Sequence, residues 1–220
     1  MELFDCLETR KSFRSFLSKQ VDNDVLRKIL EAANMSPSDM NTQPWEVFVV
    51  AGKTKDVLAK KILDEALSGR DYSPDLPFPE ELPEHIDRKA QEHRLKRFKA
   101  MGLDAADKEK VRQNFLRNFE FYGAPCVIFI GMDKSLSPWS LLDLGLFAGG
   151  ILLAAEADGL GCCVQTMPVA YPDLIRKELA ISPDISLILN ICIGHPDREN
   201  KINRYRSTRR HLNEFVKWYA

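Results

Sequence analysis

Apolar residues recur at helical spacing in two stretches near the start of the chain, residues 2–9 and residues 22–35. This spacing places the apolar side chains on one face of a helix. Asp22 stands where an N-cap is expected, and Pro37 follows the second stretch as a stop signal. The pattern therefore predicts that the chain opens with two helices.

Three later runs are rich in β-branched and aromatic residues and end at a glycine: Glu46–Gly52, Cys126–Gly131 and Ile185–Gly194. Short runs of this kind are typical of β-strands. Their nearly continuous apolar character predicts central strands that are buried on both faces.

A long helix is expected between the second and third of these runs, over about residues 138–157. Gly159 and Gly161 then suit the end of a helix that leads into another strand. The predicted order is helix, helix, strand, helix, insert, strand, helix, strand, helix, strand. This order indicates an α+β fold in which one sheet is covered by helices.

The insert, or lid, spans about residues 69–120. Residues 69–84 hold four of the twelve prolines and are expected to form a loop. Residues 85–120 are highly charged with sparse apolar positions, which predicts two amphipathic helices. With 220 residues, of which 45% are hydrophobic, the chain fits a single domain over residues 1–220.

The charge of the chain is nearly balanced, with 31 Lys and Arg residues against 32 Asp and Glu residues. This balance does not favour nucleic acid or an anionic membrane as a partner. The five cysteines are expected to be small buried hydrophobes, and adjacent Cys162 and Cys163 would point to opposite faces of a strand. The four histidines show no metal-ligand spacing, so no metal site is expected.

The longest apolar stretch, residues 141–157, is interrupted by Asp143, Glu156 and three glycines. We interpret it as too short and too polar to span a bilayer. The first ten residues carry acidic side chains where a secretion signal would be basic. A soluble cytoplasmic protein is therefore expected.

Two guanidinium groups and a hydroxyl lie close together in the N-terminal basic segment, Arg10-Lys11-Ser12-Phe13-Arg14. In an extended backbone Arg10, Ser12 and Arg14 share one side, where they could bind a phosphate and the polar edge of a ring. Taken alone, a basic pentapeptide is more often a solvated surface.

Two further segments carry candidate polar groups. The amide loop, residues 36–45 (SPSDMNTQPW), offers short amide and hydroxyl side chains for a uracil-like edge or a ribityl chain, although a plain turn explains the same residues. The C-terminal basic segment, residues 203–210 (NRYRSTRR), is either a solvated tail or the source of one or two arginines that complete a phosphate site.

The motifs RKSFR, PSDMNTQPW, GLGCCVQTMP and NRYRSTRRHLNEF occur in this chain in the order and spacing of the nitroreductase family of flavin mononucleotide (FMN) oxidoreductases. The sequence resembles that family over essentially its whole length. The segment NFEFYGAPCVIFIG resembles the nitrobenzoate-reductase branch in particular. The resemblance implies a nitroreductase-like fold, with a central mixed β-sheet covered by helices, and an intertwined homodimer.

The resemblance also implies which residues hold FMN. They are Arg10, Lys11, Ser12, Phe13, Arg14, Pro37, Ser38, Asn41, Gln43, Gln165, Thr166, Met167, Arg206 and Arg209. The N-terminal basic segment would hold the phosphate, ribityl chain and pyrimidine edge, and the amide loop would reach FMN across the dimer interface. Gln165, Thr166 and Met167 would lie beside flavin N5, and Arg209, with Arg206 as the alternative, would close the phosphate site. Deiodinase-like relatives have a threonine at the position of Met167, which disfavours deiodination.

The implied activity is a ping-pong transfer of hydride from NADH or NADPH to a small electron-poor acceptor, a nitroaromatic first of all. Negative charge that develops near flavin N1 would be stabilised by Arg14. No GxGxxG element is present for the nicotinamide pyrophosphate, so both substrates are expected to share one face. Reduction of quinones, enones or free flavin remains an alternative, and so does a non-catalytic flavin-binding protein.

Side chains in or beside the insert are candidates for the acceptor pocket. The aromatic candidates, each of which could equally be ordinary core, are Phe78, Phe98, Phe119, Phe121 and Tyr122. Basic residues such as Arg94 and Arg97 could attract a carboxylated aromatic acceptor, or they could belong to a solvated helix face.

Overall fold

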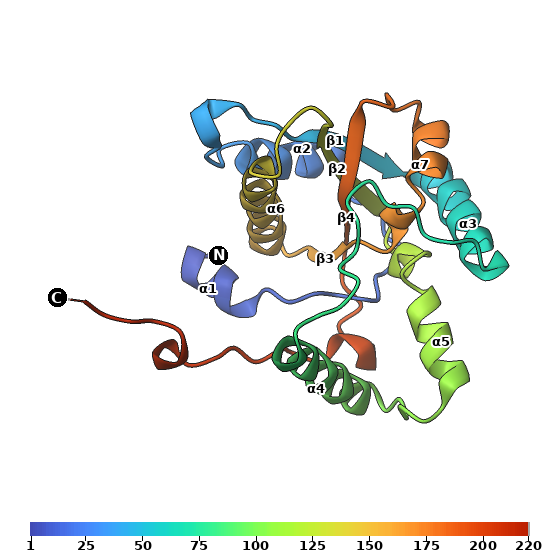
Figure 1. The fold of residues 1–220 in the computed structure, drawn as a ribbon, viewed down its shortest axis with the longest axis vertical. Helices are drawn as coiled ribbons and strands as arrows, with labels where there is room; N and C mark the ends of the chain where they lie inside the picture. Colours follow the sequence, from blue (N-terminus) through green and yellow to red (C-terminus); the bar gives the residue numbers. More distant parts are fainter. Residues whose placement is uncertain (220) are drawn as a thin grey trace.

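Four strands form one sheet in the computed structural model, which describes residues 1–219 (Figure 1). The strands are β1 (Glu46–Ala51), β2 (Cys126–Asp133), β3 (Gly161–Gln165) and β4 (Ile185–Gly194), in the order β1-β2-β4-β3. All three neighbouring pairs are antiparallel, so the four strands do not form the mixed sheet that we expected. Apolar runs reflect burial on both faces, and this burial does not fix the direction of the strands.

The position of β1 differs from the prediction. We expected a central strand, but β1 lies at one edge of the sheet, and the Val49 side chain is 43% exposed. The central places belong to β2 and β4, whose apolar residues are covered on both faces. An apolar run alone does not show whether the covering surface belongs to the same chain.

The predicted order of helices and strands is confirmed. The helices are α1 (Leu3–Thr9), α2 (Asn23–Ala33), α3 (Gly52–Ser68), α4 (Glu84–Met101), α5 (Lys108–Leu116), α6 (Ser140–Ala157) and α7 (Pro172–Leu179). Asp22 caps α2 as predicted, because its carboxylate accepts a 2.8 Å hydrogen bond from the Asp24 amide. The insert forms a proline-rich loop followed by α4 and α5.

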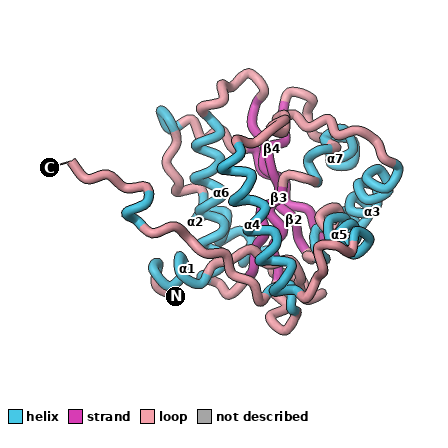
Figure 2. The backbone as a smooth tube through the Cα atoms, turned by 60° about the horizontal axis from the view of Figure 1, so that its bottom comes forward, coloured by secondary structure: helices cyan, strands magenta, loops and turns pink. Residues whose placement is uncertain are grey.

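Helices cover both faces of the sheet (Figure 2). On one face α2 and α6 pack against a core that includes Ile128 and Ile191. On the other face α3 and α7 pack against a core that includes Phe129. Cys162 and Cys163 belong to opposite cores, as predicted, and all five cysteines are buried and free.

The long helix α6 lies beside α2 on one face of the sheet (Figure 2). By length and composition alone α6 could cross a membrane, so our interpretation of this stretch as too short and too polar was wrong. A helix in the core of a folded domain has the same composition, and the two carboxylates of α6, on Asp143 and Glu156, are buried within the fold. The close approach to α2 requires Gly150, because a Cβ at this position would lie 3.0 Å from the Cα of Ala33.

Candidate functional site

The N-terminal basic segment runs along the outer edge of β3. Ser12 forms an isolated parallel bridge with Cys162, and the Phe13 amide donates a 2.9 Å hydrogen bond to the Cys162 carbonyl. The Phe13 ring is buried against Gly161, where an added Cβ would lie 2.6 Å from the ring. Since side chains alternate along an extended segment, Ser12 and Arg14 point away from the side that Phe13 occupies.

The C-terminal basic segment returns to the N-terminal basic segment through Asn203, whose side chain is buried. The Asn203 Oδ1 atom accepts a 2.7 Å hydrogen bond from the Arg14 amide, and its Nδ2 atom donates to the Ser15 carbonyl at 2.8 Å. The Lys11 ammonium donates to the Asn203 carbonyl at 2.5 Å. Asn203 belongs to the basic stretch recognised from the sequence, but nothing in the sequence marked it as a site residue.

The cations predicted for the phosphate end lie in these same two segments. The Arg206 guanidinium donates a 3.1 Å hydrogen bond to the Thr9 carbonyl, which ties it to the start of the N-terminal basic segment. The pKa of Lys11 is lowered, first by burial and then by the charges of Arg198 and Arg206. Arg209 is exposed, and its guanidinium bonds within its own segment to Ser207. The two ends of the chain therefore gather positive charge at one place.

A pocket opens next to these segments, and we call it the cationic pocket. Its volume is about 590 Å³, and it lies between α4, α5 and the outer edge of β3. Four of the predicted site residues line it, namely Arg14, Gln165, Thr166 and Met167. Of the predicted aromatic walls, Phe98 and Tyr122 line it as well, whereas Phe119 and Phe121 lie in the core beneath α3 and α7.

A buried polar network underlies the cationic pocket at Gln165. The Gln165 Nε2 atom donates to the Asn118 carbonyl at 3.0 Å, and its Oε1 atom accepts from Asn190 Nδ2 at 2.9 Å and from the Cys192 thiol at 2.7 Å. The Tyr122 hydroxyl donates to Asn118 Oδ1 at 2.7 Å, and burial raises the pKa of Tyr122 to about 12. The side-chain amide of Gln165 is therefore hydrogen-bonded within the protein, which leaves its backbone to contact a ligand.

The amide loop lies at the other end of α6. The Asp39 amide donates to the Asp143 carboxylate at 3.3 Å, and Ser38 Oγ accepts a 2.9 Å hydrogen bond from the Gln43 amide. Asn41 and Gln43 have φ angles of 57° and 46°, in the left-handed region that side chains rarely adopt. Strained backbone of this kind persists where the surrounding structure holds it in place, often at binding sites.

The two halves of the predicted FMN site are separated within the described chain. The amide loop contacts α6 at Asp143, whereas Ser12 pairs with Cys162, beyond the last residue of α6. The rise of a helix puts roughly 20 Å between Asp143 and the end of α6. No residue of the amide loop, including Pro37, Ser38, Asn41 and Gln43, lines the cationic pocket of the described chain.

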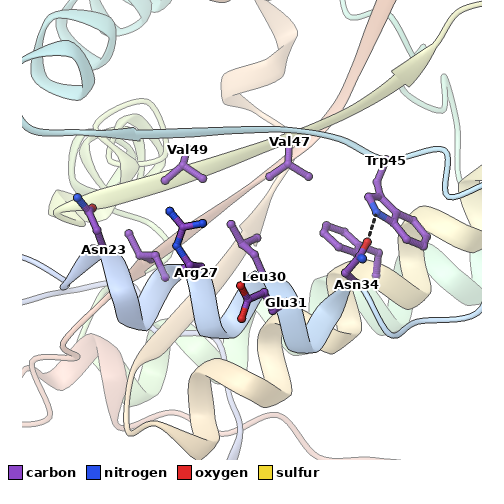
Figure 3. Close-up of a pocket in the computed structure, with 10 residues that line it drawn as sticks. Asn23, Arg27, Leu30, Glu31, Asn34, Trp45, Val47 and Val49 are labelled. Carbon is purple, nitrogen blue, oxygen red and sulfur yellow. Dashed lines mark hydrogen bonds between the residues drawn. The ribbon is translucent and has the colours of Figure 1, made fainter.

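A second concave surface lies between α2 and the edge strand β1 (Figure 3). This groove, of about 560 Å³, has apolar walls that include Leu30, Val47 and Val49. At one end Trp45 Nε1 donates a 3.0 Å hydrogen bond to Asn34 Oδ1, which Figure 3 shows as a dashed line. None of the predicted FMN residues lines this groove in the part of the chain that the structure describes.

Known proteins match this chain over nearly its whole length. The family model described as the nitroreductase family matches residues 7–195. A 4-nitrobenzoate reductase from Pseudomonas putida is 30% identical over 206 residues, which cover 91% of this chain and 88% of that protein. The solved structure of an FMN and NADPH-dependent nitroreductase NfnB, from sphigopyxis sp. strain HMH, superposes with a TM-score of 0.95 at 27% identity and covers 100% of both chains. That of the FMN-dependent NfnB from Mycobacterium smegmatis in complex with NADPH gives a TM-score of 0.93 at 26% identity and also covers 100% of both chains.

Proposed function

The chain belongs to the nitroreductase family, and from this we propose that it is an FMN-dependent oxidoreductase that passes hydride from NADH or NADPH to a small nitroaromatic acceptor. The names of two similar structures, which include FMN and NADPH, support the choice of cofactors. The name of the 4-nitrobenzoate reductase supports the class of acceptor. A ping-pong order, in which the nicotinamide leaves before the acceptor enters, is part of the proposal.

The observation that carries this proposal is the cationic pocket, where Arg14 and the backbone of residues 165–167 meet. Val164, near the end of β3, lines this pocket and is 40% exposed, so the pocket offers apolar surface for an aromatic ring. The positive charge gathered by the two basic segments lies next to it and suits a phosphate. The residues of this region therefore suit both the ring and the phosphate of FMN.

We assign the proposed FMN contacts to three regions. The phosphate and ribityl chain are held by the two basic segments, and the pyrimidine edge lies at Arg14. The N5 edge lies along residues 165–167, where Thr166 is exposed. The residues in this assignment are Arg10, Lys11, Ser12, Phe13, Arg14, Gln165, Thr166, Met167, Arg206 and Arg209 from one subunit, and Pro37, Ser38, Asn41 and Gln43 from the other.

Bound FMN would supply the reversible hydride chemistry of its ring. The chain supplies the surroundings. The Arg14 guanidinium stabilises negative charge at the pyrimidine edge, and the hydrogen bond from its amide to Asn203 fixes its backbone. Phe98 and Tyr122 wall the pocket and limit the access of water.

A homodimer is part of the proposal, because one subunit leaves large apolar side chains exposed. Phe4 of α1 is 81% exposed, Leu146 of α6 is 50% exposed, and Trp139, the residue just before α6, is 76% exposed. Met40 of the amide loop is 86% exposed. Since α1 packs on α6 and the amide loop contacts α6, these residues line one side of the molecule. Apolar surface of this extent is typical of a subunit interface.

The last described residues also suit a partner subunit. The chain from about residue 207 onward runs away from the rest of the molecule (Figures 1 and 2), and its Phe215 and Trp218 are 49% and 86% exposed. The groove beside β1 offers apolar walls and an unpaired strand edge. We assign the partner's C-terminal residues to this groove, so that each subunit covers the edge strand of the other.

Anaerobic mixing of the FMN-loaded protein with NADH or NADPH tests the proposed function. We expect rapid loss of the yellow flavin absorbance, and its return when 4-nitrobenzoate is added after the nicotinamide has been removed. Parallel lines in double-reciprocal plots would confirm the ping-pong order. Flavin that stays oxidised under excess reductant would contradict the enzyme assignment, and faster reoxidation by a quinone or an enone would contradict the choice of acceptor.

A further inference from the structure

The cationic pocket has an unusual balance of charge. Five cations line it, namely Arg14 from the N-terminal basic segment, Arg94 and Arg97 from α4, and Lys108 and Arg112 from α5. No carboxylate of residues 1–219 lines it, although acidic and basic residues are almost equal in number over the whole chain. Among the described residues, none of the five forms an ion pair.

The surroundings of Arg97 in this pocket are unfavourable for a cation. Its guanidinium lies over the Phe98 ring, 5.7 Å from the centroid, and its buried Nε atom has no hydrogen-bond partner within residues 1–219. The pKa of Arg97 is lowered by burial first and by the nearby charge of Arg14 second. A partly buried cation beside a like charge, with one buried donor unsatisfied, destabilises a fold unless an anion sits against it.

The cations of α4 and α5 are different residues from those that we assign to the FMN phosphate. Arg206 is tied to Thr9, and Arg209 bonds within the C-terminal basic segment. Arg94, Lys108 and Arg112 instead stand on α4 and α5 and line the cationic pocket, which neither Arg206 nor Arg209 lines. Helix α4 itself contacts the C-terminal basic segment, where the Tyr205 hydroxyl lies 3.1 Å from His93 Nδ1. A ligand stacked in the pocket would meet the cations of α4 and α5 at its outer end.

We propose that the lid cations Arg94, Arg97, Lys108 and Arg112 bind an anionic substituent of the acceptor, so that the preferred acceptors are aromatic carboxylates that carry the reducible group. This inference rests on the proposed function and names its substrate class. Phe98 and Tyr122 contact the ring, while the guanidinium groups receive the carboxylate. A neutral aromatic of the same shape leaves these cations unpaired and binds more weakly.

Binding of benzoate and benzamide tests the proposal without turnover. The two probes have nearly the same shape and differ in charge, and calorimetry on the FMN-loaded protein measures their affinities directly. We expect benzoate to bind about tenfold more tightly than benzamide, since the carboxylate gains charge-assisted hydrogen bonds. We expect added salt to reduce this ratio, because the outer cations are exposed.

The double variant Arg94→Gln/Arg112→Gln removes two exposed cations that the fold does not need. We expect the benzoate to benzamide ratio to fall to about twofold, and the ratio of kcat/KM for 4-nitrobenzoate over 4-nitrobenzamide to fall with it. Arg88→Gln is the matched control, because it removes an exposed arginine from α4 outside the pocket. The control should leave both ratios unchanged.

Two outcomes would overturn the inference. Equal affinities for benzoate and benzamide in the unaltered protein would show that the cations do not select an anionic acceptor. A double variant that raises KM for NADPH but keeps both ratios would show that these cations bind the nicotinamide phosphates instead. Either result can occur in an active nitroreductase, and the preference for benzoate can be measured even if flavin reduction fails, so the two proposals fail separately.

Discussion

The backbone amide of Arg14 donates a 2.7 Å hydrogen bond to the side-chain oxygen of Asn203, a residue 189 positions further along the chain. The same side chain donates to the Ser15 and Asp197 carbonyls, each at 2.8 Å. One buried amide therefore fixes the direction in which the N-terminal basic segment passes β3. The position of the Arg14 guanidinium in the cationic pocket depends on it.

Replacing Asn203 should cost both stability and FMN affinity. Asn203→Ala removes one hydrogen bond from each of three backbone groups that are buried or partly buried, so we expect the free energy of unfolding to fall by about 2–4 kcal/mol in urea titrations. FMN should bind roughly tenfold more weakly, because Arg14 is no longer held in place. The control Asn213→Ala changes an exposed asparagine in the same terminal region and should alter neither quantity. An unchanged FMN affinity in Asn203→Ala would refute a positioning role.

Gln165 should matter for stability more than for chemistry. Gln165→Ala removes the hydrogen bonds of this side chain to the Asn190 amide, the Cys192 thiol and the Asn118 carbonyl. We expect the free energy of unfolding to fall by about 2–4 kcal/mol. Val164→Ala, at the exposed neighbouring position, should cost well under about 1 kcal/mol. Equal losses in the two variants would mean that the network does not stabilise β3.

The buried thiols predict that stability falls at alkaline pH. Burial raises the pKa of Cys126 to about 12, and it also raises those of Cys162, Cys163 and Cys192. An unfolded thiol titrates near about 8.5, so above that pH the unfolded chain loses protons that the folded chain keeps. The contribution of these thiols to the free energy of unfolding is therefore fully present below about pH 8.5. Above that pH it falls by roughly 1.4 kcal/mol per pH unit for each such thiol.

Urea unfolding between about pH 7 and about pH 10 measures this slope. Cys126→Ala should reduce the slope by about 1.4 kcal/mol per pH unit, because one titrating group is removed. A free energy of unfolding that stays level over this range would contradict the burial of the thiols in the folded state.

A charge placed on the exposed face of α6 should separate the subunits. Leu146 is 50% exposed on α6, and Leu146→Glu would bury a carboxylate in the proposed interface. We expect light scattering to show a monomer that has lost most of its FMN. Leu67→Glu is the matched control, since Leu67 is 48% exposed on α3, which covers the opposite face of the sheet. A dimer that persists in Leu146→Glu would place the interface elsewhere.

Local patterns predicted most of the fold. The order of helices and strands follows from periodicity and from caps such as Asp22, which act within a few residues. The place of β1 did not follow, because exposure of Val49 depends on which strands pair with it over long distances. The direction of the strands was also beyond the pattern, since apolar residues on both faces suit either arrangement.

The candidate site was predicted in part. Arg14 and residues 165–167 line one pocket, as the motifs implied. The role of Asn203 could not be predicted, because a single asparagine among arginines carries no periodic signal. Its hydrogen bonds form only where the two ends of the chain meet. Arg94 and Arg97 suited either an acceptor carboxylate or a solvated helix face, and the packing of α4 and α5 shows that they line one pocket with Lys108 and Arg112.

The central claim is that each FMN site combines the N-terminal basic segment of one subunit with the amide loop of the other. Mixing two defective variants, Arg14→Ala and Asn41→Ala, tests it most directly. Each variant alone should bind little FMN. After the two are unfolded together and refolded, half of the dimers should be mixed, and each mixed dimer should have one intact site, so that about a quarter of the normal FMN content returns. A refolded mixture that binds no more FMN than the separate variants would contradict a site shared between subunits.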